Sequence, residues 1–405
     1  MFSSLTRAQR VQFLLILLVA MLYFGAASMM LYLSKFVVDL GGNEQEAGAL
    51  LGVALVAMMA LAPFVGGLSD TYGSKPLVVF GLFVYSAATY THIYVDDLGV
   101  GLVFLRFLQG VGHACVFSPL FAAVIRIVPV QFRARGIGYF TVCIQVGNTV
   151  GSLFGEYCVA YLSYASLFTV SAIICCAGAI VGFYIREEGA VESPEEDTSD
   201  VTREKASKRP LQFFGYLSML VLLGCTFGIS LQFMPIFFDF MLRESWIASP
   251  ISNVYFMTTT LITVAVVRLS LGRLSDGIYR DRMMNVCHGI MVLVVVGFAG
   301  IRSETSAFIA AVIFGLSYGL LYPAINSKLM GMASVNERGK ISGWLAMFYE
   351  FGFRGLPILL GSVVYYVSYA AMFYLLALSY FLGVGVLVYC KSKDKKNLTV
   401  STVLS

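Results

Sequence analysis

Charge is scarce in this chain. Charged residues make up 12% of its 405 residues, whereas hydrophobic residues make up 59%. A soluble protein of this composition would leave large apolar areas facing water, so lipid is the expected solvent. The net charge is only +4, and the basic residues are dispersed over short loops rather than clustered on one helix or strand. The sequence therefore argues against nucleic acid as a partner.

Residues for metal or nucleophilic chemistry are equally few. The three histidines, His92, His113 and His288, are scattered over three apolar segments. The eight cysteines all fall in apolar segments and show no ligand-like Cys/His spacing. An integral membrane enzyme would need clustered ligands, or a nucleophile beside its base. We therefore expect no metal site, no cofactor and no enzymatic activity, and we interpret the cysteines as small buried hydrophobes.

Long apolar runs dominate the chain instead. A helix that spans a bilayer needs about 20 mostly apolar residues. Twelve such stretches follow one another, near residues 11–39, 45–65, 76–95, 99–125, 137–160, 165–185, 212–242, 249–270, 283–301, 306–333, 341–362 and 369–390. The first stretch exceeds a signal-peptide core and lacks a small-residue cleavage site, so we expect it to stay in the mature protein.

Basic residues are distributed unevenly between the two sides of the predicted membrane. With twelve spans both termini lie on one side, and the loops of that side carry most of the lysines and arginines. The opposite loops have only Lys35, Arg243 and Arg302. Because basic loops stay inside, both termini are predicted to be cytoplasmic in a multi-pass protein of the inner (cytoplasmic) membrane.

One long hydrophilic segment divides the chain. Residues 186–211 are rich in Glu, Asp and Lys and lie midway along the sequence. They form the predicted cytoplasmic linker between two six-helix bundles, because charged segments of this kind stay solvated. The first bundle is expected in residues 1–185, and the second in residues 212–405 with a short cytoplasmic tail.

The two halves carry related sequences. Three pairs of stretches, each about 205 residues apart, match: GGLSDTYGSK (66–75) with LGRLSDGIYRDR (271–282), Ser118–Pro119 with Tyr322–Pro323, and RARGIGYF (133–140) with ERGKISGW (337–344). Each long stretch of the first pair is predicted to be a turn that follows a span. Parallel halves around an axis along the membrane normal enclose a cavity at the midplane, where transporters of this kind hold substrate.

The repeated turn resembles the signature between helices two and three of the major facilitator superfamily. Ser74 and Lys75 stand where that signature is usually richer in arginine. The resemblance covers the whole chain, and it implies an all-α integral membrane fold with 12 transmembrane helices in two pseudo-symmetric six-helix bundles. It also implies that Asp70 docks near the start of helix eleven and holds an inner gate shut.

Electrostatics favours such a gate. A carboxylate is stabilised beside the positive N-terminal end of a helix and beside basic side chains, and glycines allow a close approach. By the repeat, the second turn is expected to meet helix five in the same way. The predicted gate residues are Asp70, Gly67 and Gly73 with Arg338 or Lys340, and Asp276 with Arg133 or Arg135. The alternative is a pair of solvated loop charges.

Two further motifs resemble those of the proton-linked drug antiporters of the same superfamily. LRFLQGVGHA (105–114) matches the helix-four pattern R-x-x-Q-G-x-G, whose buried arginine, here Arg106, is implicated in proton coupling. Helix five keeps the glycine spacing of the antiporter motif, with Ser152 replacing its proline and Glu156 its last glycine. The matching glycines are Gly138, Gly147, Gly151 and Gly155. Export is thereby favoured, with close packing across the interface between the halves; ordinary helix packing is the alternative.

Polar residues deep inside the spans are costly, so each needs a partner, a water-filled cavity or a function. The deepest are Arg106, His113, Gln145, Glu350 and Arg354. Glu350 and Arg354 are spaced i,i+4, so they share a helix face, where they either form an internal salt bridge or serve substrate and protons. Arg126, Arg268 and Lys328 lie near the inner ends, where gate packing or snorkelling is expected.

This deep set is more basic than acidic. Guanidinium groups suit carboxylates, and Tyr318 and Tyr322 are expected to line the rest of the cavity. The second half is also similar to bacterial exporters of siderophores and metallophores. We expect a monomeric exporter of a small anionic or zwitterionic metabolite, such as a siderophore, that works by alternating access in the bilayer and is driven by the proton gradient. The alternatives are uptake of the same class, a polyspecific drug exporter, and a non-transporting membrane receptor.

Overall fold

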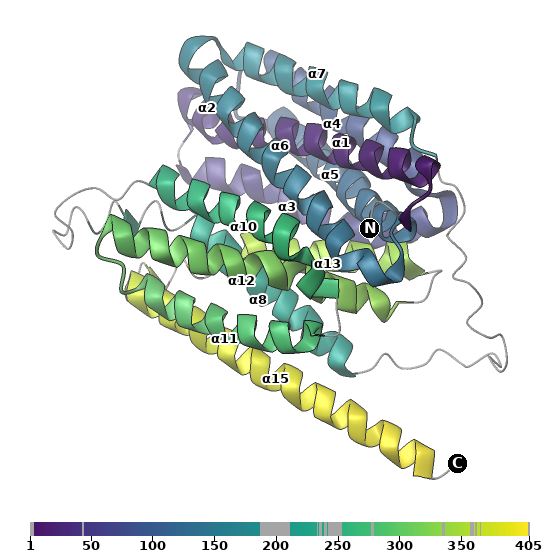
Figure 1. Ribbon diagram of the computed structural model, residues 1–405. Helices are drawn as coiled ribbons and strands as arrows, with labels where there is room; N and C mark the ends of the chain where they lie inside the picture. Colours follow the sequence, from purple (N-terminus) through teal and green to yellow (C-terminus); the bar gives the residue numbers. More distant parts are fainter. Residues whose placement is uncertain are drawn as a thin grey trace. The chain divides into compact units, whose positions relative to one another are not determined.

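The computed structural model describes residues 4–42, 44–186, 211–232, 234, 237–238, 241, 253–276, 279–333, 337–356, 360, 363–364 and 366–403. Every regular element in these ranges is helical (Figure 1). Within them, 11 helices are long and apolar enough to cross a membrane. The remaining predicted span, 341–362, runs partly over residues outside the described ranges. The prediction of an all-α membrane protein is confirmed.

The chain forms two compact units. Unit 1 comprises Met1–Phe132, Gly136–Ala190 and Ala333–Met347, and unit 2 comprises Arg133–Arg135, Val191–Met332 and Phe348–Ser405. The expected helix eleven is thus shared, because the helix α13 (Arg338–Glu350) belongs to unit 1 up to Met347 and to unit 2 after it.

Unit 1 is a bundle in which small residues bring helices together. Its helices are α1 (Arg7–Met29), α2 (Leu33–Asp39), α3 (Glu44–Tyr72), α4 (Ser74–Thr91), α5 (Val100–Ile127), α6 (Arg133–Tyr161) and α7 (Tyr164–Phe183). The helix α4 packs on α5 and α7, α3 packs on α5, and α1 packs on α7. A side chain at Gly81 of α4 would strike the carbonyl oxygen of Gly112 on α5. Backbone contact of this kind is how helices associate where lipid removes the hydrophobic driving force.

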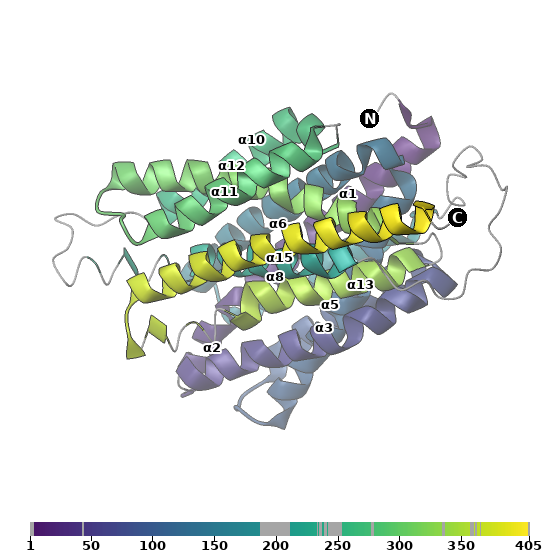
Figure 2. The ribbon, with the colours of Figure 1, turned by 90° about the horizontal axis from the view of Figure 1, so that it is seen from below.

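Unit 2 is built from α8 (Leu211–Gln232), α10 (Asn253–Asp276), α11 (Arg280–Phe298), α12 (Glu304–Gly331), the π-helical segment η6 (Phe351–Gly355) and α15 (Tyr369–Val403). The helix α12 packs on α10 and α11, and α8 packs on α15 and η6. Figure 2 shows α10, α11 and α12 lying together. A side chain at Gly352 of η6 would strike the backbone of Val221 on α8, so this crossing also requires glycine.

The helices extend further than their apolar runs predict. The helix α3 continues through Asp70 to Tyr72, and α10 continues to Asp276. The break after α3 is at Gly73, where φ is +83°, a conformation that glycine adopts without steric cost. Nothing in residues 66–72 stops a helix earlier. The predicted turn Gly66–Lys75 is therefore wrong in extent, because most of it is the last part of a helix.

Candidate functional sites

Asp70 lies at the N-terminus of α13, within unit 1. Its Oδ1 accepts a hydrogen bond from the Gly339 backbone N–H at 2.5 Å, and its Oδ2 accepts one from the Lys340 N–H at 2.8 Å. Arg126 Nη1 is 3.8 Å from Asp70 Oδ1. The first N–H groups of a helix have no partner inside the helix and carry a partial positive charge. A carboxylate there is therefore stabilised both by hydrogen bonds and by the electrostatic attraction of the helix dipole. The structure thus places Asp70 at the helix that the resemblance implies.

Glycines set the distance between α3 and α13. A side chain at Gly66 would collide with the Gly339 carbonyl oxygen, and one at Gly343 would collide with that of Ala62. A Cβ at Gly67 would instead meet no atom within 4 Å. The close approach predicted for Gly67 therefore depends on Gly66, which the helical geometry turns toward α13.

Arg126 joins this site to the start of α4. Its guanidinium donates to the Ser69 carbonyl oxygen at 3.5 Å, to Ser69 Oγ at 3.3 Å and to Ser74 Oγ. Burial, and then the positive charge of Arg126, lower the pKa of Arg338. Lys340 contributes its backbone N–H, whereas its side chain is exposed. The serines were missed because a serine in an apolar run carries no signal of its partner.

The second repeat has a different crossing. Gly272 of α10 faces Arg135 of α6, and a Cβ at Gly272 would lie 3.2 Å from Arg135 Cγ. Arg133, the first residue of α6, is buried. Asp276 ends α10, but its side chain lies outside the described residues, so its predicted contact does too. In the repeat, Arg135 is the counterpart of Gly339. The long side chain of Arg135 therefore occupies, in unit 2, the position that a glycine occupies in unit 1.

Arg106 belongs to a hydrogen-bonded network between three helices. Its Nη1 donates to Gln109 Oε1 at 2.6 Å, and its Nε donates to the Leu50 carbonyl oxygen at 3.4 Å. Gln109 Nε2 in turn donates to Thr89 Oγ1 at 2.8 Å. The predicted proton-coupling arginine therefore ties α5 to α3 and α4.

His113 has its partner on another helix. Its Nδ1 lies 2.8 Å from Tyr23 Oη of α1, and its ring packs edge-on against Phe24. Arg106 and His113 lie on one helix, yet the bonds above tie them to different neighbours. Gln145 is half-buried on α6 and accepts a hydrogen bond from Asn148 at 3.4 Å.

Tyrosines gather in the middle of unit 2. Tyr318 and Tyr349 share a hydrogen bond, with 2.6 Å between their hydroxyl oxygens. Phe227 of α8 stacks on Tyr318 with centroids 4.3 Å apart and an interplanar angle of 6°. Tyr322 meets Tyr349 edge-on at 5.0 Å. We call Tyr318, Tyr322 and Tyr349 the tyrosine cluster.

Glu350 and Arg354 form an ion pair beside the tyrosine cluster. Arg354 Nε lies 3.1 Å from Glu350 Oε2, and the side chains are 43% and 8% exposed, respectively. The spacing predicts this pair on an α-helix, but the segment Phe351–Gly355, which follows Glu350 and includes Arg354, is π-helical. Such segments occur mostly as single turns and frequently at functional sites.

Arg268 also belongs to this neighbourhood. It is only 4% exposed, and its guanidinium lies over the rings of Tyr318 and Tyr322, 5.4 and 5.5 Å from their centroids. Its Nε donates to the Gly319 carbonyl oxygen at 3.3 Å. The helix α10 continues two turns beyond Arg268, to Asp276.

The glycines of the antiporter-like motif pack inside unit 1. Side chains at Gly147 and Gly151 would strike the carbonyl oxygens of Met21 and Gly25 on α1, and one at Gly155 would strike the Tyr32 ring. The partner of this stripe is therefore α1 of the same unit, which corrects the expected contact across the halves. The remaining motif residues are Gly138, whose carbonyl oxygen accepts from Thr141 Oγ1 at 3.0 Å, and Glu156, which is exposed.

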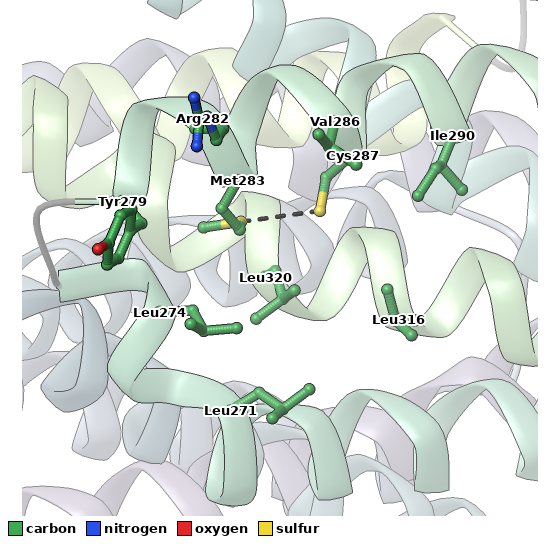
Figure 3. A pocket seen from close by; sticks show the side chains of 10 residues that line it. All are labelled: Leu271, Leu274, Tyr279, Arg282, Met283, Val286, Cys287, Ile290, Leu316 and Leu320. Carbon is green, nitrogen blue, oxygen red and sulfur yellow. Dashed lines mark hydrogen bonds between the residues drawn. The ribbon is translucent and has the colours of Figure 1, made fainter.

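A cavity of about 400 Å³ opens between α10, α11 and α12 (Figure 3). Its lining is apolar apart from Tyr279 and Arg282, and the only hydrogen bond drawn in it joins Cys287 to Met283, with 3.7 Å between the sulfur atoms. None of the predicted site residues lines it. A polar substrate finds few partners there, so the tyrosine cluster with its charges is the better candidate site.

Long apolar helices that bury charged side chains are typical of multi-pass membrane transporters. The chain belongs to the Major Facilitator Superfamily, because the family model matches residues 13–354. The predicted family and the prediction that the chain is not an enzyme are thereby confirmed.

Individual proteins show the same relationship. Multidrug resistance protein 2 of Bacillus subtilis (strain 168) is 23% identical over 365 residues, which cover 86% of this chain and 87% of that protein. The crystal structure of the human organic anion transporter MFSD10 (TETRAN) superposes with a TM-score of 0.73 at 16% identity, covering 94% of this chain and all of that one. The transporter FucP, crystallised in the outward conformation, gives 0.70 at 13% identity, covering 95% and 99%. The two structures share the fold of this chain.

Proposed function

We propose that the protein exports a small anionic or zwitterionic metabolite, with siderophore-like compounds as the leading class, in exchange for protons. The observation that carries the proposal is the ion pair between Glu350 and Arg354. It presents one titratable carboxylate and one cation side by side within a helical bundle. Charges at such positions are rare and mark substrate and proton pathways.

The pair can couple the two fluxes through competition. A zwitterionic substrate would place its carboxylate on Arg354 and its ammonium group on Glu350. A proton on Glu350 removes the charge that holds the ammonium group, so proton and substrate exclude one another. Two ligands that compete for one residue move in opposite directions in an alternating-access cycle, which is antiport.

For a purely anionic substrate, the proton and the substrate would bind together instead of competing. This case favours proton-coupled uptake, the second candidate function. An anion on Arg354 leaves the buried Glu350 carboxylate without its counterion, and an unpaired buried charge prefers to neutralise. Proton and anion would then bind together and travel in one direction. The substrate's net charge therefore decides the direction of coupling.

Proton movement in vesicles tests both versions. The protein is reconstituted in liposomes with a pH indicator inside, and iminodiacetate or citrate is added outside. Alkalinisation of the lumen as iminodiacetate enters supports antiport, whereas acidification with citrate supports symport. An unchanged luminal pH during transport of both compounds contradicts proton coupling. Comparing the metabolites that accumulate in cells with and without the protein identifies the natural substrate.

A polyspecific drug exporter is a further candidate, favoured by the similarity to multidrug resistance protein 2 of Bacillus subtilis. The site argues for acids instead, because Arg268 and Arg354 outnumber Glu350. Tight binding of organic cations, with no affinity for carboxylates, would decide for the drug exporter.

The gate role of Asp70 is part of the same proposal. The carboxylate stabilises whichever conformation holds α3 against the start of α13, and transport requires this contact to break and form again. The surplus of basic residues supports a cytoplasmic location for both ends of the chain and for this contact. Labelling of a cysteine introduced at Lys395, from either side of the membrane, tests this orientation.

A further inference from the structure

Arg268 is a buried cation that pairs with no carboxylate among the described residues. It is 4% exposed, and the ion pairs among the residues that the structure describes do not include it. Its Nη2 is buried and has no hydrogen-bond partner in that part of the chain. Taking a charge out of water costs several kcal/mol unless partners replace the lost hydration. Something other than a described side chain is needed to balance this arginine.

The surroundings of Arg268 hold it without neutralising it. The rings of Tyr318 and Tyr322 attract the guanidinium through their negative faces, and the Gly319 carbonyl oxygen accepts from Nε. A guanidinium fixed in one orientation, with an N–H still unused, is preorganised for an oxyanion, since its planar fork matches a carboxylate.

The tyrosine cluster links Arg268 to the ion pair described above. Tyr318 contacts the guanidinium of Arg268 and shares a hydrogen bond with Tyr349. Tyr349 stacks on Phe353 with ring centroids 6.0 Å apart, and the guanidinium of Arg354 lies over the Phe353 ring, 5.6 Å from its centroid. One neighbourhood of unit 2 thus contains two guanidinium groups and one carboxylate. The complementary molecule carries two carboxylates and one ammonium group.

We infer that Arg268, held by Tyr318 and Tyr322, is a second carboxylate-binding site, so that the substrate is an aminopolycarboxylate rather than a simple amino acid. The inference rests on the proposed function and narrows its substrate class. Arg354 receives one carboxylate, Glu350 receives the ammonium group, and Arg268 receives the other carboxylate.

A comparison of two probes and two residues tests the inference. Binding of iminodiacetate and of N-methylglycine, which lacks one of its carboxylates, is measured by calorimetry on the full chain in lipid nanodiscs. A charge-assisted hydrogen bond is typically worth 1.5–3 kcal/mol, or about 10- to 100-fold in affinity. Wild type should prefer iminodiacetate by about that factor, and Arg268→Gln should bind both probes equally.

Matched variants separate contact from folding. Arg273→Gln removes an exposed arginine from the same helix and should keep the wild-type preference. Arg268→Lys keeps the charge but loses the fork, so it should retain part of the preference. If Arg268→Gln does not fold, Arg268→Lys and Tyr318→Phe, which keeps the ring, carry the test, and their melting temperatures report folding. If both of these variants are folded and keep the full wild-type preference for iminodiacetate over N-methylglycine, the inference is overturned.

The outcomes also distinguish this inference from the proposed function. If Arg268→Gln keeps the full preference for iminodiacetate while Arg354→Gln loses binding of both probes, the second site is refuted and the anion transporter stands. If wild type binds neither probe nor citrate, both fail together.

Discussion

The two units each bury an arginine inside a helical bundle, and the two arginines are held differently. In unit 1, Arg106 hydrogen-bonds to oxygen atoms of two neighbours, and Asp70 caps a helix. In unit 2, Arg268 has a nitrogen that no described residue hydrogen-bonds, and the Glu350–Arg354 pair leaves Arg354 half-exposed. Satisfied groups stabilise a conformation, whereas unsatisfied groups are available to a ligand. The difference teaches that burial of a charge marks a binding site only when its hydrogen bonds are incomplete.

The strongest test of this division is Glu350→Gln. If unit 2 carries the proton chemistry, the variant should lose uphill transport almost completely, while downhill exchange of substrate continues. Flux in vesicles with and without an imposed pH gradient measures this. Glu304→Gln, an exposed carboxylate change on α12, is the control and should behave as wild type. Gradient-driven transport at the wild-type rate by Glu350→Gln would remove the carboxylate from the coupling mechanism.

The variant Arg106→Gln tests whether the hydrogen-bonded arginine of unit 1 is structural. The loss of hydrogen bonds between α5, α3 and α4 should lower the free energy of unfolding by about 2 kcal/mol, because buried partners stay unsatisfied. Substrate affinity of the folded protein should be unchanged. Thermal unfolding in detergent and calorimetry measure the two effects. A stable variant that has lost proton coupling would instead support the role implied by the antiporter motif.

The variant Asp70→Asn tests whether a carboxylate that is hydrogen-bonded within unit 1 also controls transport. The amide keeps an acceptor for the α13 N–H groups but loses the charge, an interaction worth up to about 2 kcal/mol at a helix N-terminus. We expect transport to fall about tenfold without a change in the amount of folded protein. Asp96→Asn, at an exposed position outside the helices, is the control. Wild-type transport by Asp70→Asn would refute the gate role.

Tyr318→Phe should have the smallest effect. It keeps the ring beneath Arg268 but removes the hydroxyl that bonds to Tyr349, a neutral hydrogen bond worth about 1 kcal/mol. We expect a few-fold weaker binding of iminodiacetate and little change in melting temperature, by the same calorimetry. A large fall in melting temperature with an unchanged affinity for iminodiacetate would show that the tyrosine cluster stabilises the fold and does not contribute to binding.

The length of the apolar runs predicted the fold, because the bilayer fixes both the length and the polarity of a spanning helix. Spacing along one helix was informative too, since Glu350 and Arg354 do pair. Residues whose role depends on a helix end or a helix face were misplaced. The end of α10 was misplaced because no proline marks it after residue 270, and Gly66 rather than Gly67 meets α13 because the crossing of two helices decides which face is covered.

The π-helical segment has a consequence for comparing this chain with its relatives. A π turn holds about one residue more than an α turn, so it is equivalent to a single-residue insertion in an α-helix. A relative with one residue fewer between Glu350 and Leu356 would form a continuous α-helix there, and the helix on either side would keep its faces, because the π turn only accommodates the additional residue. An arginine three residues after the aligned glutamate would still share its face, since side chains spaced i,i+3 are neighbours on an α-helix. A single gap in this stretch is therefore compatible with the charge pair, which relatives can carry at either spacing.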